Sequence, residues 1–211
     1  MGTRRERSRS PGRRVEHLAH RRVFVLSRCR RLRGHPNDGR RCLEATRKTA
    51  TRVERGLFNG PQLYSVAMIL EQEGLLDGAE LLGTDCRADA IWSAREGVFE
   101  RDHVANLDSR TRDRYFERTC ATWRIASSLR NHTRWQVADA TRVKPPGIWD
   151  LVLCRNLVIY LREPAGRTLL QDIASALAPG GFLVVGRAER PPDSRGLRAV
   201  GTCTYQNNVI A

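Results

Sequence analysis

The chain has 211 residues, of which 40% are hydrophobic, and it carries a formal net charge of +14. This length and apolar content allow one full domain with an extension. No apolar run approaches the roughly 20 residues that span a bilayer, so we expect no membrane insertion. The opening residues, MGTRRERSRSPGRR, stay polar past the charged region, unlike a secretory signal, and we expect a cytoplasmic protein.

The positive charge is concentrated at the start of the chain. Residues 1–55 hold 18 Lys and Arg against 5 Asp and Glu, whereas the rest of the chain holds 19 against 18. We therefore predict an arginine-rich leader over residues 1–50, poorly ordered or partly helical around residues 15–26 and 42–48, and a folded domain over residues 51–211. We do not expect nucleic acid as the main partner, but a leader that binds DNA or RNA stays an alternative.

The six cysteines do not indicate a metal site. They stand at positions 29, 42, 86, 120, 154 and 203, with no CxxC pair and no histidine at a spacing suited to zinc. We expect reduced structural thiols and no bound metal.

The clearest fold signal lies in residues 148–189. Apolar runs at residues 151–154 and 182–185 are typical of strands that are covered on both faces. Between them one helical face is apolar and Pro179-Gly180-Gly181 is expected to stop the helix; that face comprises Leu169, Leu170, Ile173, Ala176 and Leu177. Such a β-α-β unit predicts an α/β fold with a doubly wound, mostly parallel sheet, whose ligands bind at the carboxyl ends of the strands. Cys154-Arg155-Asn156 is such an end.

A glycine loop stands before the first strongly patterned helix. Gly56 and Gly60 bracket this loop, and the helix that follows has an apolar face made by Leu63, Val66, Ala67, Ile69 and Leu70. A glycine loop that opens a helix has the outline of a cofactor cradle, although two glycines at this spacing also occur in ordinary loops.

Asp85 closes a predicted strand over residues 81–85. In dinucleotide-type sheets an acid at this place accepts hydrogen bonds from ribose hydroxyls. The same residue could instead cap a helix predicted for residues 88–96. Because the loop, the helix, the strand and the acid follow one another at suitable distances, we favour ribose binding.

Asp139 follows a predicted strand over residues 135–137 and also has two interpretations. It could start the turn that comes next, or it could accept a hydrogen bond from an adenine amine. Further on, residues 197–210 alternate in polarity and predict two strands joined by a hairpin. This pair would give the sheet an antiparallel C-terminal edge.

Six short motifs, found in order, carry a resemblance to a known family. They are Tyr64-Ser65-Val66-Ala67-Met68, Gly83-Thr84-Asp85, Ala94-Arg95-Glu96-Gly97-Val98-Phe99, Arg114-Tyr115-Phe116, Cys154-Arg155-Asn156-Leu157-Val158-Ile159-Tyr160 and Leu177-Ala178-Pro179-Gly180-Gly181. From Leu57 onward the chain resembles the S-adenosylmethionine-binding domain of the CheR-type methyltransferases, which methylate glutamate side chains of chemotaxis receptors. The Pro-Gly-Gly turn is common to many methyltransferases, whereas the CRN-x-x-IY run is far more specific.

The resemblance implies a Rossmann-like class I methyltransferase fold, S-adenosylmethionine as the cofactor, and a receptor's cytoplasmic region with methylatable glutamates as the partner. It also implies site roles. Gly56 and Gly60 would belong to the cofactor loop, and Asp85 would bind the ribose. Asp139 and Ala140 would flank the adenine, and Arg155 and Asn156 would lie by the methionine end. Tyr160 would face the methyl group and help to place the acceptor.

The chain departs from the family pattern at two places. Pro61 and Gln62 stand where the family's loop carries two adjacent glutamates, and a neutral Gln62 offers the cofactor's ammonium only an uncharged acceptor. The family's helical N-terminal domain has no match in residues 1–50. These departures keep two alternatives open: a non-catalytic binding module that retains the fold, and a nucleic-acid methyltransferase guided by the arginine-rich leader.

Overall fold

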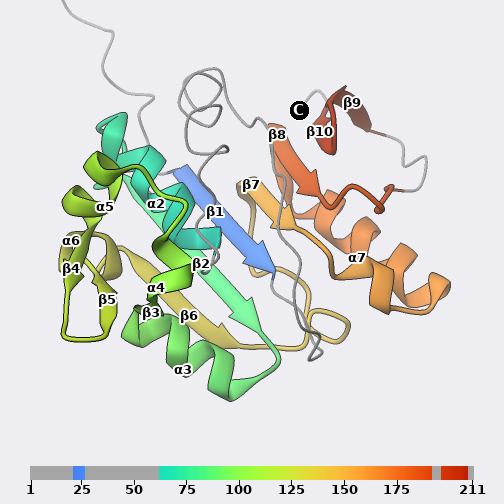
Figure 1. The fold of residues 1–211 in the computed structure, drawn as a ribbon. Helices are drawn as coiled ribbons and strands as arrows, with labels where there is room; N and C mark the ends of the chain where they lie inside the picture. The colour runs from blue at the N-terminus through green and yellow to red at the C-terminus, as the bar shows by residue number, and fades with distance from the viewer. Residues whose placement is uncertain (1–20, 27–61, 192–195, 209–211) are drawn as a thin grey trace, which may run out of the picture.

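The computed structural model describes residues 21–26, 62–191 and 196–208 (Figure 1). The strands of its larger sheet are β1 (Arg21–Leu26), β2 (Ala79–Asp85), β6 (Thr133–Val137), β7 (Trp149–Cys154), β8 (Leu177–Val185), β9 (Leu197–Gly201) and β10 (Thr204–Asn207). A smaller sheet contains β3 (Val98–Glu100), β4 (Phe116–Arg118) and β5 (Thr122–Ile125). The helices are α2 (Gln62–Gln72), α3 (Ala88–Glu96), α4 (Arg101–Val104), α5 (Ser109–Tyr115), α6 (Ser127–Arg130), α7 (Glu163–Ser175) and the 3₁₀ helix η1 (Val158–Tyr160).

The larger sheet has seven strands in the order β6-β2-β1-β7-β8-β10-β9. The strands from β6 to β8 pair in parallel, whereas β10 is antiparallel to both β8 and β9. The predicted α/β fold is therefore confirmed, with its doubly wound, mostly parallel sheet and its antiparallel C-terminal edge. Since the strand order reverses at β1, a ligand crevice is expected at the carboxyl ends of β1 and its two neighbours.

The central strand comes from a segment for which a helix was predicted. Residues 21–26 form β1, which pairs with β2 on one side and with β7 on the other. The helix prediction for residues 15–26 is wrong over these residues, because VFVL is a continuous apolar run that suits a strand buried on both faces. Phe24 is only 3% exposed. The predicted helix at residues 42–48 lies outside the described residues, and the division of the chain at residue 50 otherwise stays a prediction.

Each face of the larger sheet carries its own hydrophobic cluster under a layer of helices. Along β7, Leu151 belongs to the first cluster, while Val152 and Cys154 belong to the second. α2 and α3 contribute to the first cluster and α7 to the second. Figure 1 shows α7 on the β7–β8 side of the molecule and the small sheet on the opposite, β6 side. Burial on both faces explains why the parallel strands are apolar runs rather than alternating sequences.

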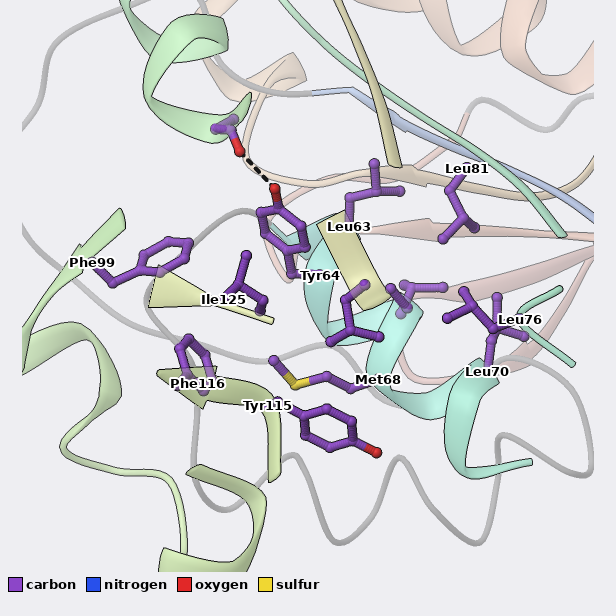
Figure 2. Packing of buried hydrophobic residues seen from close by; sticks show 14 of the residues in the cluster. Leu63, Tyr64, Met68, Leu70, Leu76, Leu81, Phe99, Tyr115, Phe116 and Ile125 are labelled. Atoms are coloured by element: carbon purple, nitrogen blue, oxygen red, sulfur yellow. Dashed lines mark hydrogen bonds between the residues drawn. The ribbon is translucent and has the colours of Figure 1, made fainter. Parts of the chain in front are cut away.

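The Tyr-Ser-Val-Ala-Met segment of α2 is part of the core (Figure 2). All five apolar residues predicted for the buried face of α2 are buried, and so are Tyr64 and Met68. The Tyr64 hydroxyl donates a hydrogen bond to the Ala94 carbonyl at 2.7 Å, and its ring meets Phe99 edge to face. Tyr64 thus joins α2 to the end of α3 and to the small sheet.

The small sheet, with strand order β3-β5-β4, was not predicted from the sequence. Its strands have only three or four residues each, which is too short for a polarity pattern to stand out. Phe99, Phe116 and Ile125 from these strands are buried in the same cluster as α2. The small sheet therefore folds as part of the main core.

Helix α7 ends before the position predicted for it. It stops at Ser175 because the Trp149 amide donates to the Ala176 carbonyl at 2.8 Å and draws the chain into β8. Pro179-Gly180-Gly181 lies inside β8, where the register with β7 shifts. A side chain at Gly181 would meet the Ala178 and Trp149 carbonyl oxygens at 2.9 and 3.1 Å, so this irregularity requires glycine.

A hydrogen bond between Tyr115 and Glu71 ties α5 to α2 and predicts a pH effect. The Tyr115 hydroxyl donates to Glu71 Oε2 at 2.6 Å, and Arg114 donates to the same carboxylate. Burial, together with the Glu71 hydrogen bond, raises the pKa of Tyr115 to about 12. Because the folded pKa lies above the unfolded value of 10.0, this contribution to stability is present below pH 10 and is lost as pH rises toward 12.

We expect Tyr115→Phe to lower the free energy of unfolding in urea by about 1 kcal/mol at neutral pH. The difference from the native chain should shrink above pH 10, since the native chain alone then loses the phenol proton. In a Glu71→Gln background the same substitution should cost less. A cost independent of pH and of Glu71 would contradict the assigned hydrogen bond.

Candidate functional site at the carboxyl edge of the sheet

The two segments predicted to bind a cofactor end at the same edge of the sheet. Leu26 at the end of β1 is level with Thr84 of β2 on one side and with Cys154 of β7 on the other. Asp85 and Arg155 therefore each stand one residue beyond the same level, separated by β1. With neighbouring strands about 4.8 Å apart, their backbones lie about 10 Å apart. This is the span over which the strand order reverses.

Asp85 is buried at the end of β2, with 4% of its surface exposed. Its carboxylate accepts hydrogen bonds from the Arg87 backbone N–H at 2.9 Å and from Arg87 Nε and Nη2 at 3.3 and 3.4 Å. The N-cap position of α3 is Arg87, and no side chain caps that helix. The alternative in which Asp85 caps α3 is therefore wrong, while its predicted ribose role stays a prediction.

The end of β6 is tied to the end of β2, because the Ala138 N–H donates to the Asp85 carbonyl at 3.0 Å. Asp139 follows and accepts hydrogen bonds from the backbone N–H and the hydroxyl of Thr141 at 2.9 and 2.7 Å. These hydrogen bonds lower the pKa of the Asp139 carboxyl. Asp139 thus starts a turn, as one of its two interpretations has it. Ala140 packs against the α7 cluster, and the adenine role of both residues stays a prediction.

The Cys154-Arg155-Asn156 segment leaves β7 and turns sharply. Asn156 has a left-handed backbone, with φ of 55°, and its side chain is exposed. The chain then forms η1, which ends at Tyr160, and 40% of the Tyr160 surface is exposed. The alternative, in which Tyr160 is an aromatic residue packed under α7, does not agree with this exposure. Its side chain is open to solvent on the loop that follows β7.

Glu189 is a residue of this edge that the sequence analysis missed. Glu189 is only 2% exposed. Its carboxylate accepts hydrogen bonds from four backbone N–H groups, of which three belong to the loop after β7. Burial, with the nearby Glu189 carboxylate, raises the pKa of the Cys154 thiol, which therefore stays protonated. One acid in a polar stretch after β8 carries no local signal that could have indicated this role.

The described residues contain no group of His, Cys, Asp and Glu that could hold a metal ion. Cys120, Cys154 and Cys203 are free thiols, whereas Cys86 is disulfide-bonded, so the expectation of reduced thiols is wrong at that residue. Among the described helices, none is long and apolar enough to cross a membrane. Gly56 and Gly60, predicted for the cofactor loop, lie outside the described residues.

The groups at this edge suit a nucleoside. Asp85 supplies a carboxylate that can accept hydrogen bonds from vicinal hydroxyls, and an ionised carboxylate has about four acceptor positions. Val137 at the end of β6 and Ile159 in η1 are large apolar side chains that are 50% and 45% exposed. Val137 is level with Asp85 in the pairing of β6 and β2, so a carboxylate and an exposed apolar side chain stand at the same pair of strand ends.

Comparison with known proteins identifies the family. The sequence pattern described as "CheR methyltransferase, SAM binding domain" matches residues 54–205. The chain belongs to the CheR methyltransferase family. This CheR-family chain therefore contains that family's S-adenosylmethionine-binding domain, and the predicted family is confirmed.

Individual relatives agree with this assignment. Over 147 residues the CheR-family chain is 30% identical to the probable biofilm formation methyltransferase WspC of Pseudomonas putida, covering 67% of this chain and 35% of that protein. It is 27% identical over 138 residues to the chemotaxis protein methyltransferase of Escherichia coli, covering 62% and 48%. The CheR-family chain thus spans between a third and a half of the length of these relatives.

Among solved structures, the N-methyltransferase NodS of Bradyrhizobium japonicum matches with a TM-score of 0.41 and 13% identity, covering 89% of this chain and 85% of that one. The class I methyltransferase fold of the CheR-family chain is visible in its own strand order, which reverses at β1 and in which β10, antiparallel to both neighbours, lies between β8 and the edge strand β9.

Proposed function

We propose that this chain is an S-adenosylmethionine-dependent O-methyltransferase that acts on glutamate side chains in the cytoplasmic region of a chemotaxis receptor. The observation that carries the proposal is the meeting of Asp85 and the Cys154-to-Tyr160 loop at one sheet edge, on either side of β1. The family assignment supports the same reaction. A cytoplasmic location follows from the proposed partner.

The proposed roles are those that the resemblance to the family implies for each residue. Asp85 would accept hydrogen bonds from the ribose hydroxyls, and Asp139 and Ala140 would flank the adenine. Arg155 and Asn156 would lie beside the methionine end, together with the loop that holds Gly56 and Gly60. When bound, S-adenosylmethionine supplies an electrophilic methyl group on a sulfonium.

Arg87 matters for this proposal because, in this structure, its side chain donates hydrogen bonds to the Asp85 carboxylate. Its side chain is 39% exposed, so its guanidinium can turn toward water without disturbing the core. We expect ribose hydroxyls to replace the two side-chain hydrogen bonds of Arg87, while the bond from its backbone N–H keeps Asp85 in place.

The acceptor requires little acid–base chemistry. A glutamate side chain is ionised at neutral pH, with an ordinary pKa of about 4.3, so no general base has to remove a proton. The protein must mainly hold the acceptor carboxylate in line with the methyl group and keep the pair oriented. Tyr160, exposed at the end of η1 and four residues after Asn156, is the side chain we assign to placing the acceptor.

The proposal is tested by two measurements on the full chain. Calorimetry should detect binding of S-adenosylhomocysteine, and radiolabelled S-adenosylmethionine should transfer its methyl group to a receptor cytoplasmic fragment. Tyr160→Phe should lower kcat by about tenfold, the low end of what removing one substrate-positioning group costs, and leave cofactor affinity unchanged. Absence of binding at millimolar ligand would defeat the proposal. Binding without transfer would instead support the non-catalytic module.

The nucleic-acid alternative makes a different prediction. Its binding to DNA or RNA should weaken steeply as salt concentration rises and should disappear when the arginine-rich leader, residues 1–50, is removed. Because residues 21–26 form β1, replacing the leader's arginines outside that strand serves the same purpose without removing it. Binding that does not depend on salt concentration, or no binding at all, would exclude the nucleic-acid alternative.

A further inference from the structure

Glu189 makes an unusual set of contacts between two neighbouring strand ends. Its Oε1 accepts hydrogen bonds from the Leu157 and Val158 amides at 2.7 and 2.6 Å, and its Oε2 accepts from the Asn156 and Gly186 amides at 2.9 and 2.6 Å. Three of these donors belong to the loop after β7 and the fourth follows β8. The carboxylate therefore bridges the two strands beyond the point where their own pairing ends.

The Glu189 carboxylate and the Asn156 side chain leave no room for a side chain at Gly186. A side chain at Gly186 would lie 2.5 Å from Asn156 Oδ1 and 2.7 Å from Glu189 Oε2. Gly186 therefore lets Asn156 pack its amide directly over the backbone that follows β8. Asn156 in turn adopts a left-handed backbone, a conformation that asparagine accepts more readily than most residues with a side chain. The backbone N–H groups of Asn156, Leu157 and Val158 then all point at the Glu189 carboxylate.

We propose that Glu189 is a positioning residue that fixes Asn156 and the start of η1, and through them Tyr160, at the carboxyl edge of the sheet. The part of this proposal that concerns methyl transfer, an effect of Glu189 on cofactor binding and catalysis, rests on the proposed function. The part that concerns the loop does not depend on the function, because Glu189 fixes the loop through hydrogen bonds within this chain. Glu189 does not reach the edge itself, being buried behind Asn156.

A carboxylate is the side chain this arrangement needs. All four neighbours are N–H donors, and an ionised carboxylate accepts at both oxygens. Glutamine has the same size but replaces one oxygen with an NH₂ group, so in either orientation two of the four bonds are lost. Those two backbone N–H groups would then be buried without an acceptor.

The test compares Glu189→Gln with a control of similar structural cost. Asn207 is also buried, and its amide bridges the Leu177 and Ala178 carbonyls at the other end of β8. Asn207→Ala should lower the melting temperature about as much as Glu189→Gln but leave the carboxyl edge unchanged. For both full-length variants we would measure amide hydrogen exchange without cofactor and affinity for S-adenosylhomocysteine.

In Glu189→Gln we expect the Leu157 and Val158 amides to exchange at least about tenfold faster and S-adenosylhomocysteine to bind about tenfold more weakly. Asn207→Ala should change neither quantity by more than about twofold. Unchanged exchange at Leu157 and Val158 in Glu189→Gln, or equal loss of affinity in both variants, would overturn the proposal.

If the native chain binds no S-adenosylhomocysteine, the proposed function fails, while the exchange comparison still decides whether Glu189 holds the loop. If Glu189→Gln does not fold, Glu189→Asp keeps the charge but is one methylene shorter. It should also lose protection at Leu157 and Val158, and full protection there would refute the assignment.

Discussion

Asp85→Ala is expected to weaken binding of S-adenosylhomocysteine by about 10- to 100-fold. A hydrogen bond to a charged group contributes about 1.5–3 kcal/mol, and at a buried carboxylate little water competes for it. Asp85 is 4% exposed at the end of β2. Calorimetry at neutral pH measures this effect directly, and a thermal melt of the variant without ligand confirms that it is folded.

Two control variants separate ribose binding from a structural role of Asp85. Arg87→Ala removes the side-chain hydrogen bonds that occupy the Asp85 carboxylate, so its affinity should be equal to or higher than that of the native chain. Asp139→Ala should cost less than Asp85→Ala, because Asp139 is 35% exposed at its side chain and already bonded to Thr141. Unchanged affinity in Asp85→Ala would remove the ribose assignment.

Tyr64→Ala should have the largest effect on stability, about 3–5 kcal/mol lost from the free energy of unfolding. Tyr64 is fully buried, and Figure 2 shows its ring on the side of α2 that faces Phe99 and Ile125 of the small sheet. The substitution removes the aromatic contacts with Phe99 and Trp135 and leaves a cavity between these elements. For a domain of ordinary stability this is a large fraction of the total.

Tyr64→Phe isolates the hydroxyl. It keeps the ring and removes the hydroxyl that donates to the Ala94 carbonyl, so it should cost about 1 kcal/mol. Both variants are compared by urea unfolding at neutral pH. Equal costs for the two would show that the ring contributes little and would contradict the packing described for α2.

The elements that depend on local pattern were predicted well. Helix α3 has the predicted bounds, 88–96, since its apolar residues follow a helical spacing and Gly97 ends it in a left-handed conformation. β2 was predicted from residue 81 and begins two residues earlier, at Ala79. The β-α-β unit of β7, α7 and β8 is also as predicted, apart from the earlier end of α7.

The errors occurred where distant segments decide the structure. Residues 21–26 are a strand because two neighbours, far along the chain, supply their hydrogen bonds. The small sheet forms because its very short strands share a core with α2. Glu189 reaches three amides that precede it by 31 to 33 positions, a relation that no local pattern contains.

The amino-acid sequence by itself determined the family, the type of fold and the identity of the candidate site residues, because motifs and apolar periodicity are properties of short segments. Only the tertiary structure decided which segment supplies the central strand, that Asp85 lies against Arg87 rather than capping α3, and that Glu189 holds the loop of Asn156. These features depend on hydrogen bonds between groups that meet only once the sheet is assembled.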